Sequence, residues 1–563
     1  MSRKRIASLL SAVMLITTLT ACNSAAMQAI QQLQSEASSS AVSSESGGSS
    51  SASTSIPMPN LPQVSSSEVV SSSQSSTASS SVPMSSETLI IDEPLEMFDV
   101  LIGGNGDREW KDDRYLYETS WQFVLLDDVA SMDYPDLAYS LYDLNMVVNN
   151  AGYDVALEFA QEIDANPDEY HNYAYEETVH VCRADSKIVS LLYETYYNAG
   201  GAHPSITQWS VNFDSLGGYV SLSSILNEPG EFTELLLKRL NEDNPDIEFG
   251  TDLTPYLQNA FENDGIYWTI DYQSLRVYFQ PSEIAAAAAG SPQAVFWFDE
   301  YPDLLKQGYM YAPDSYAVEL PISASVRHDL KAGDGEKDTI CVAGYPGHDM
   351  AYNEFELWLN DGSYPLLTEE IDRAYAFLIH TEDNSGPRIY LYLIAYGFSD
   401  YPHLLIYDLG GEAPVKVDEL YGVGLSTEWN EEFGSLIGLI SDPDAFALDT
   451  HLELLGTMFG SRAYSVDPST GLPVTPNQFY YIPAEPELTT LQPVEVVDAI
   501  SGEKTTLPAG ITVYVVNSDG EAEVEVMTDD YEFYRITIDT SGWPDTINGI
   551  PEDEVFDGIM YAG

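Results

Sequence analysis

A serine-rich, low-complexity segment at residues 23–88 decides which part of this chain can fold. It consists mainly of Ser with Ala, Val, Thr, Gln and a few Pro, and it contains no Lys or Arg. Such a composition cannot bury enough apolar surface to offset the entropy that folding removes. We therefore expect a flexible tether with an end-to-end distance of about 45 Å and a stretched limit of roughly 200 Å. Folded domains are expected only in residues 89–563.

The first 22 residues have the features of a secretory signal. Three basic residues, Arg3, Lys4 and Arg5, precede an apolar run at 6–19, and Leu-Thr-Ala-Cys ends at Cys22. The apolar run is too short to span a bilayer as a mature helix. Leu-Thr-Ala-Cys resembles the bacterial lipobox, which implies cleavage before Cys22 and a diacylglycerol on its thiol. An ordinary signal peptide with a chance cysteine is the alternative.

The charge of the chain is strongly acidic, with 21 Lys and Arg against 90 Asp and Glu. Removal of residues 1–22 leaves 18 basic and 90 acidic groups, a net charge of −72. This surface repels nucleic acid and anionic lipid and attracts cations and basic proteins. It serves either solubility outside the cell or the steering of a cationic partner. Hydrophobic residues at 44% and aromatic residues at 12% indicate folded cores.

Common catalytic motifs are missing from the sequence. The eight histidines are scattered, without an HExxH pair or a Cys/His cluster of zinc-ligand spacing. Gly-x-Ser-x-Gly and the phosphate-binding Gly-Lys-Ser/Thr loop are also absent. After Cys22 the only cysteines are Cys182 and Cys341, which we predict to be separate buried thiols. The sequence therefore favours binding over catalysis.

We predict a multidomain chain that is α+β first and then mostly β. Residues 89–310 combine an apolar-periodic helix, at 137–148, with alternating strands. Residues 313–490 contain recurrent strand patterns and predict a β-rich sandwich or partial propeller. Residues 491–563 contain further short strands.

A motif in the first region resembles a known family. Gly200-Gly201-Ala202-His203-Pro204 is followed by Asn212-Phe213-Asp214, and later by 275–285 and 296–298 in the same order. This pattern is similar to an extracytoplasmic domain of unknown function, of the DUF3298 type. The domain forms the outer part of RsiV-type anti-sigma factors and the non-catalytic part of PdaC-type peptidoglycan deacetylases. The resemblance implies an α+β fold with an antiparallel sheet packed on helices, and a role in binding or sensing at the cell surface. We expect the cell to be of the Gram-positive type.

The resemblance also suggests ligands. RsiV-type proteins recognise lysozyme, a basic protein that would suit an acidic body. We expect a basic protein such as lysozyme, or a wall glycan such as peptidoglycan, as the ligand. The sequence shows no transmembrane helix with a sigma-binding segment and no Thr-Phe-Asp-Asp metal motif, which argues against anti-sigma and deacetylase activity. The rival interpretation is a cell-envelope hydrolase, or a peptidoglycan-modifying enzyme, with an unrecognised active site.

Candidate ligand-binding residues surround the glycine turn. They are Tyr197, His203 and Trp209. Pro204 restricts His203 to extended geometry, and two glycines permit a positive φ. His203 could act as a base, or it could hold the turn through hydrogen bonds to the backbone, which is the favoured interpretation.

A second candidate site is an acidic loop at residues 329–338. Its possible calcium ligands are Asp329, Asp334 and Asp338, around a glycine turn that resembles the calcium loops of repeat-type propellers. Calcium takes about 6–8 oxygen ligands. The spacing is one residue too long, and Lys331 occupies a position where an acidic ligand is usual. A plain polar turn without a cofactor is therefore the favoured interpretation.

The last region resembles a bacterial SH3-type domain. Leu507-Pro508-Ala509-Gly510 precedes a strand at 511–516, and Asn517-Ser518-Asp519-Gly520 is a turn after it. The resemblance implies a small barrel that binds wall peptides or braces a neighbouring domain, and bracing is the favoured role.

Overall fold

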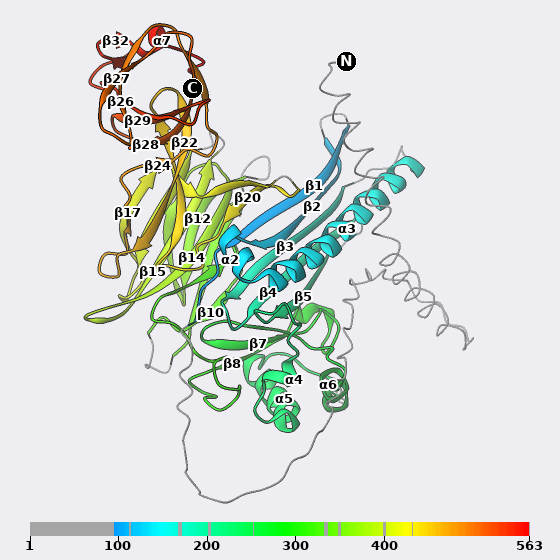
Figure 1. Ribbon diagram of the computed structural model, residues 1–563. Helices are drawn as coiled ribbons and strands as arrows, with labels where there is room; N and C mark the ends of the chain where they lie inside the picture. Colours follow the sequence, from blue (N-terminus) through cyan, green and yellow to red (C-terminus); the bar gives the residue numbers. More distant parts are fainter. Residues whose placement is uncertain are drawn as a thin grey trace, which may run out of the picture. The chain divides into compact units, whose positions relative to one another are not determined.

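The computed structural model describes residues 95–111, 114–166, 172–200, 204–250, 253–331, 336–346, 351–397, 401–430 and 432–561. These residues form seven-, nine- and twelve-stranded sheets and two smaller ones, with helices concentrated before residue 263 (Figure 1). The predicted fold class, α+β followed by mostly β, is confirmed. Among the described helices, none combines the length and apolar character needed to cross a bilayer.

The first sheet has seven strands in the order β19-β20-β1-β2-β3-β4-β5. Its pairs are antiparallel except β2 with β3, which run parallel. Two of its strands come from the predicted middle region and extend the edge at β1, where Leu101 pairs with Gly438. The bounds are β1 Val100–Lys111, β2 Arg114–Leu126, β3 Tyr173–Ala184, β4 Val189–Ala199, β5 Ser205–Phe213, β19 Thr427–Asn430 and β20 Gly434–Gly438.

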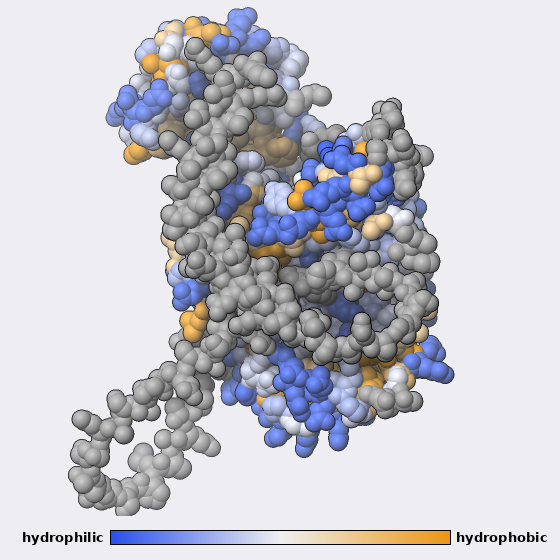
Figure 2. Space-filling view, turned by 90° about the vertical axis from the view of Figure 1, so that its right-hand side faces the viewer, coloured by the Kyte–Doolittle hydropathy of each residue, from blue (hydrophilic) through white to orange (hydrophobic). Residues whose placement is uncertain are grey.

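The long helix α3 (Pro135–Ala165) connects the parallel strands β2 and β3, as such a crossover requires. A short helix, α2 (Asp128–Asp133), precedes it. The predicted apolar stripe of Leu141, Leu144 and Val148 is buried against the sheet, and the outward side of α3 is largely hydrophilic (Figure 2). The helix therefore covers one face of β1–β3, and other elements, such as β9 (Tyr316–Leu320) beside β3, contact the sheet elsewhere.

Trp121 on β2 fixes how closely α3 approaches the sheet. Its side chain is fully buried, and its Nε1 donates to Asn149 Oδ1 at 2.9 Å. A Cβ at Gly152 would overlap the Trp121 indole, so only glycine fits there. One turn earlier, Asn145 accepts from Val124 N at 3.1 Å and donates to Val124 O at 2.7 Å.

A three-stranded sheet, β6-β7-β8, packs with short helices on β4 and β5. Buried polar side chains of the first sheet hold β6: Ser190 Oγ accepts from Ile270 N at 3.0 Å, and Ser210 Oγ accepts from Trp268 N at 2.8 Å. The bounds are α4 Leu222–Ile225, η1 Pro229–Glu231, α5 Phe232–Asp243, α6 Leu253–Glu262, β6 Tyr267–Ile270, β7 Ser274–Tyr278, η2 Ala287–Ala289 and β8 Gln293–Trp297.

The nine-stranded sheet has the order β10-β11-β12-β14-β15-β16-β17, with β13 on β12 and β9 on β14. Alternating residues of its strands form one large apolar cluster. The bounds are β9 Tyr316–Leu320, β10 Val326–His328, β11 Asp338–Pro346, β12 Tyr352–Leu359, β13 Gly362–Leu367, β14 Ile371–Asp383, β15 Gly386–Gly397, β16 Pro402–Asp408 and β17 Val415–Tyr421.

The twelve-stranded sheet has the order β18-β21-β22-β24-β28-β29-β30-β26-β27, with β23, β25 and β33 as branches. These pairings form an open path in the described residues, and the SH3-like character of 491–563 stays a prediction. The bounds are β18 Val423–Leu425, β21 Phe446–Glu453, β22 Thr457–Val466, β23 Pro473–Val474, β24 Tyr480–Tyr481, β25 Glu487–Thr490, β26 Val494–Asp498, β27 Lys504–Leu507, β28 Thr512–Ser518, β29 Glu523–Thr528, β30 Phe533–Thr537, β33 Phe556–Asp557, the separate pair β31 Thr546–Ile547 and β32 Ile550–Pro551, and α7 Glu552–Val555.

A cluster of cations lies between the three-stranded and the nine-stranded sheets. Arg276, Arg327 and Lys337 approach the ring of Trp297, with their charged groups 5.6, 5.7 and 5.1 Å from its centroid. Each cation also has a carboxylate partner within 3.2 Å. The carboxylates are Asp243, Asp271, Asp299 and Asp329. Basic residues, scarce in this chain, are thus used to join two parts of the fold.

Candidate functional site

A groove of about 620 Å³ lies on the first sheet, over strands β1, β2 and β3. Alternation along paired strands places Gly106, Ser120 and Glu176 on one face, because Gly106 pairs with Ser120 and Ser120 with Glu176. Trp121 packs against α3 on the opposite face. The groove is lined by Gly104–Arg108, Glu118–Gln122 and Glu176–Thr178. We call this the acidic groove.

Two glycines keep the floor of the acidic groove open. A Cβ at Gly106 would overlap the carbonyl oxygen of Thr119, and one at Gly104 would lie 3.3 Å from the carbonyl oxygen of Trp121. Glycine inside a strand weakens it and often marks a close approach by a ligand or another backbone. The missing side chains leave exposed backbone where a ligand can approach.

Carboxylates form a row across the same face. Glu118 on β2 and Glu176 on β3 line the groove, and Glu194 on β4 lies beside them. Desolvation, and then the charges of Glu194 and Glu118, raise the pKa of Glu176. Glu194 Oε2 accepts a hydrogen bond at 2.9 Å from the side-chain amide of Gln208, which is neutral. Arg108, which pairs with Glu118, is a cation in the same lining, but the carboxylates outnumber it. The groove therefore holds an excess of negative charge that a cationic ligand would relieve.

The next residue along β3, Glu177, faces the helix side of the sheet and is 3% exposed. Its carboxylate accepts from Tyr175 at 2.8 Å and from the Trp209 indole at 2.9 Å. Burial raises the pKa of Glu177, although these hydrogen bonds oppose the effect. The predicted ligand-binding residue Trp209 is itself buried and stacks on Tyr193 at 4.1 Å. Trp209 thus supports the sheet beneath the groove, and a direct ligand contact stays a prediction.

The other predicted ligand-binding residues lie elsewhere. Tyr197 is half-buried, and its ring lies 5.6 Å from Phe159 of α3. Burial, with Glu158 next, raises its pKa. Gly200 has a φ of +73°, as expected for the glycine turn. His203 and the lipidation candidate Cys22 lie outside the described residues.

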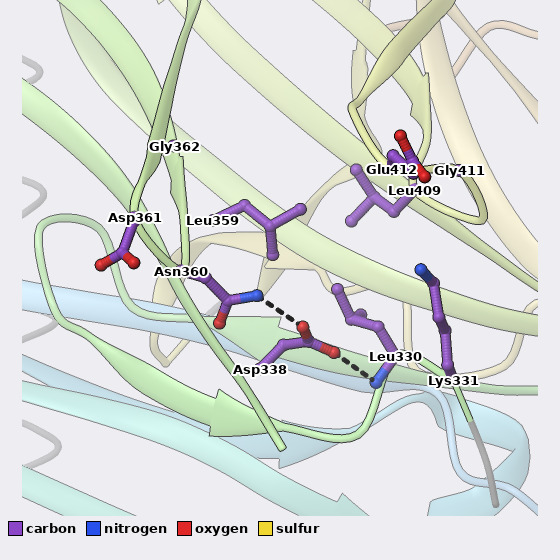
Figure 3. Close-up of a pocket in the computed structure, with 10 residues that line it drawn as sticks. All are labelled: Leu330, Lys331, Asp338, Leu359, Asn360, Asp361, Gly362, Leu409, Gly411 and Glu412. Atoms are coloured by element: carbon purple, nitrogen blue, oxygen red, sulfur yellow. Dashed lines mark hydrogen bonds between the residues drawn. The ribbon is translucent and has the colours of Figure 1, made fainter. Parts of the chain in front are cut away.

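Two of the three predicted calcium ligands are already engaged by protein donors. Asp329 accepts from Lys337 Nζ at 2.7 Å. Asp338 accepts from Asn360 Nδ2 at 2.7 Å and from Leu330 N at 3.3 Å, beside a small pocket (Figure 3). The described residues contain no group of three or more His, Cys, Asp or Glu that could hold a metal. Asp334 lies outside the described residues, so calcium binding stays a prediction.

Cys182 and Cys341 are free thiols, as predicted, but both are half-buried where buried thiols were expected. Burial raises the pKa of the Cys182 thiol to about 12, which makes it an unreactive core residue.

Comparison with known proteins gives partial likenesses to solved structures. No protein-family model matches this chain, and no curated protein matches it significantly. Two solved structures of DUF3298 family proteins are similar to part of it. One, from Bacteroides fragilis, has 13% identity and a TM-score of 0.26, covering 38% of this chain and 98% of its own. The other, from Pseudomonas aeruginosa, has 14% identity and a TM-score of 0.25, covering 39% and 97%.

These two proteins carry the family name that residues 200–214 suggested from the sequence. TM-scores this low carry no argument about the function of this chain. The RsiV-like, lipoprotein and SH3-like features stay predictions.

Sequence reasoning missed the acidic groove. Its local signal is Gly103-Gly104-Asn105-Gly106, a glycine-rich stretch inside a strand, followed by the acidic residues of β2. Only the pairing of β2 with β3 across the α3 crossover brings Glu176 to the same place.

Proposed function

We propose that this protein is a lipid-anchored surface protein that binds a basic protein, such as lysozyme, in the acidic groove without catalysing a reaction. The observation that carries this proposal is the raised pKa of Glu176 beside Glu118 and Glu194, over a floor of glycines. A site with excess negative charge and exposed backbone favours Lys or Arg side chains from a partner.

The charge of the whole chain supports the same kind of ligand. A mature net charge of −72 creates a field that draws cationic proteins toward the surface. Such steering acts mainly on the association rate and weakens as salt shortens the Debye length. Binding should therefore be strongly dependent on ionic strength.

The proposed location is the outer side of the cell membrane, reaching into the wall. It rests on the lipobox-like sequence ending at Cys22 and on the serine-rich composition of 23–88. A diacylated cysteine would anchor the chain through two acyl chains. In this proposal, sensing means that the folded part of the chain, held at the membrane by the tether, binds the ligand and signals that it is bound.

The test is calorimetric titration of residues 23–563, the chain that follows the lipidation candidate Cys22, with lysozyme at low and at physiological ionic strength. The double variant Glu118→Gln/Glu176→Gln should weaken binding at least about tenfold, or about 1.4 kcal/mol. A matched control, Glu495→Gln/Glu503→Gln, removes the same charge from exposed positions on and beside β26, and should bind almost as wild type.

Equal losses in both double variants would mean that only net charge matters and would remove the groove from the proposal. Failure to retain either lysozyme or purified peptidoglycan, together with turnover of a muropeptide, would favour the rival envelope hydrolase.

A further inference from the structure

A pair of exposed aromatic side chains lies on the solvent face of β11, β12 and β13, away from the acidic groove. Trp358 on β12 is 42% exposed, and Tyr345 on β11 is 38% exposed. Partly exposed aromatic rings can supply apolar contact area to a ligand. We call Tyr345, Trp358, Glu356 and Ser363 the aromatic platform.

Hydrogen bonds hold the platform in one arrangement. Trp358 Nε1 donates to the Tyr345 hydroxyl at 3.1 Å, and that hydroxyl donates to Glu356 Oε2 at 2.9 Å. Ser363 Oγ donates to the same carboxylate oxygen at 3.0 Å. Both rings are therefore oriented before a ligand arrives, which reduces the entropy that binding must remove.

Small residues pair with Trp358 on both neighbouring strands, while Glu354 and Glu356 share the same face of β12. Trp358 pairs with Cys341 on one side and with Ser363 on the other, and Glu356 pairs with Ala343. Paired residues share a face, so these small side chains surround the indole. Cys341 marks the position of Trp358 on β11, because the two residues pair. It lies four residues from Tyr345, so the platform extends about 13 Å along β11. That length accommodates more than one pyranose ring.

We propose that the aromatic platform binds a neutral saccharide chain. Pyranose rings have flat apolar faces that stack on exposed indole and phenol rings, and their hydroxyls hydrogen-bond to carboxylate and hydroxyl groups such as those of Glu356 and Ser363. The flat face of three paired strands presents its rings side by side, whereas a cage for a cationic group surrounds its ligand with rings.

Charge excludes the anionic alternatives. Glu354 and Glu356 stand on the same face of β12, and the chain as a whole is strongly acidic. Uronic-acid or phosphate-bearing polymers and anionic membranes would be repelled. The inference uses a different surface from the acidic groove and does not depend on the proposed binding of a basic protein.

The test uses calorimetric titration of the mature chain with hexamers of N-acetylglucosamine and of glucose, and with hexalysine as a cationic probe. Trp358→Ala should reduce affinity for at least one sugar hexamer by tenfold or more, and Trp358→Phe should retain part of it. Trp429→Ala is the matched control, because Trp429 is 78% exposed on β19 of another sheet. Thermal melts should show that all three variants fold.

Three outcomes would overturn the proposal: no binding of either sugar hexamer, sugar binding that Trp358→Ala leaves unchanged, or loss of hexalysine binding alone in Trp358→Ala. Loss of sugar binding in Glu118→Gln/Glu176→Gln with no effect of Trp358→Ala would assign the sugar to the groove instead.

Discussion

Asp449 offers a quantitative test of how this acidic chain tolerates buried charge. It lies on β21, is 6% exposed, and accepts a hydrogen bond from Thr427 N of β19 at 2.9 Å. Burial, the largest cause, and the nearby Glu428 raise its pKa to about 6, against the opposing effect of hydrogen bonds from Ser461 and Thr427. The ionised carboxylate is therefore less stable in the folded chain than in water.

The sign and size of the effect follow from linkage. A carboxyl with a raised pKa favours folding fully below its ordinary pKa of 3.8, and this contribution is lost as pH rises through about 6. The interval between the ordinary pKa of 3.8 and the raised pKa of about 6, at about 1.36 kcal/mol for each unit, corresponds to about 3 kcal/mol of folding free energy. At pH 7 the wild-type chain thus carries a penalty of that order, and Asp449→Asn removes it while keeping an oxygen for Thr427 N.

The assay is urea unfolding at pH 4 and pH 7, followed by tryptophan fluorescence. The stability difference between Asp449→Asn and wild type should be roughly 2.4 kcal/mol more favourable to the variant at pH 7 than at pH 4, because about 0.5 kcal/mol of the penalty is already present at pH 4. Comparing the two proteins at each pH cancels the other titrating carboxylates. Asp530→Asn, at an exposed turn, is the control and should show no such difference.

The reasoning is refuted if Asp449→Asn and wild type differ by the same amount at both pH values. It is refuted equally if the variant is the less stable protein at pH 7, because Asp449 would then be a stabilising anion.

Three further outcomes are expected. Gly152→Ala should lower the free energy of unfolding by about 2 kcal/mol in urea melts, because the added Cβ would overlap Trp121. The cost of overpacking exceeds the helix-propensity gain of about 1 kcal/mol. Gly230→Ala, with open space around it, is the control and should leave stability unchanged. Arg183→Met should lose about 3–5 kcal/mol in thermal melts by leaving Asp185 buried without its 2.7 Å partner, and adding Asp185→Asn should recover part. EDTA should leave the melting temperature unchanged. A calcium-dependent rise in the melting temperature would instead support a calcium site in the 329–338 loop.

Features that depend on nearby residues were predictable from the sequence. The apolar spacing of Leu141, Leu144 and Val148 predicted a helix, and all three are buried in α3. The glycine turn after β4 has the positive φ expected of Gly200. In both places, a local period or a local backbone requirement determines the structure.

Features that depend on distant pairing were not predictable. Strand β20 joins β1 by pairing Gly438 with Leu101, and nothing near either residue specifies the other. The hydrogen bond from Trp209 to Glu177 depends on the pleat and on strands far apart in the chain, so its sequence neighbours do not specify it, and ligand contact by Trp209 stays a prediction. The acidic groove needs Gly106 and Glu176, which only the β2–β3 crossover brings together.

The ion pairs that bury basic side chains also affect how well the folded chain resists proteases that cleave after Lys or Arg. Trypsin-like enzymes cleave after Lys or Arg, and the chain has 21 such residues in 563. The side chains of Arg183, Arg239 and Lys337 are only 0%, 9% and 4% exposed in their ion pairs. Cleavage there requires local unfolding of packed elements. Burial in an ion pair therefore protects these three positions from basic-specific proteases, whereas Arg327 and Lys238, with side chains 40% and 64% exposed, stay accessible.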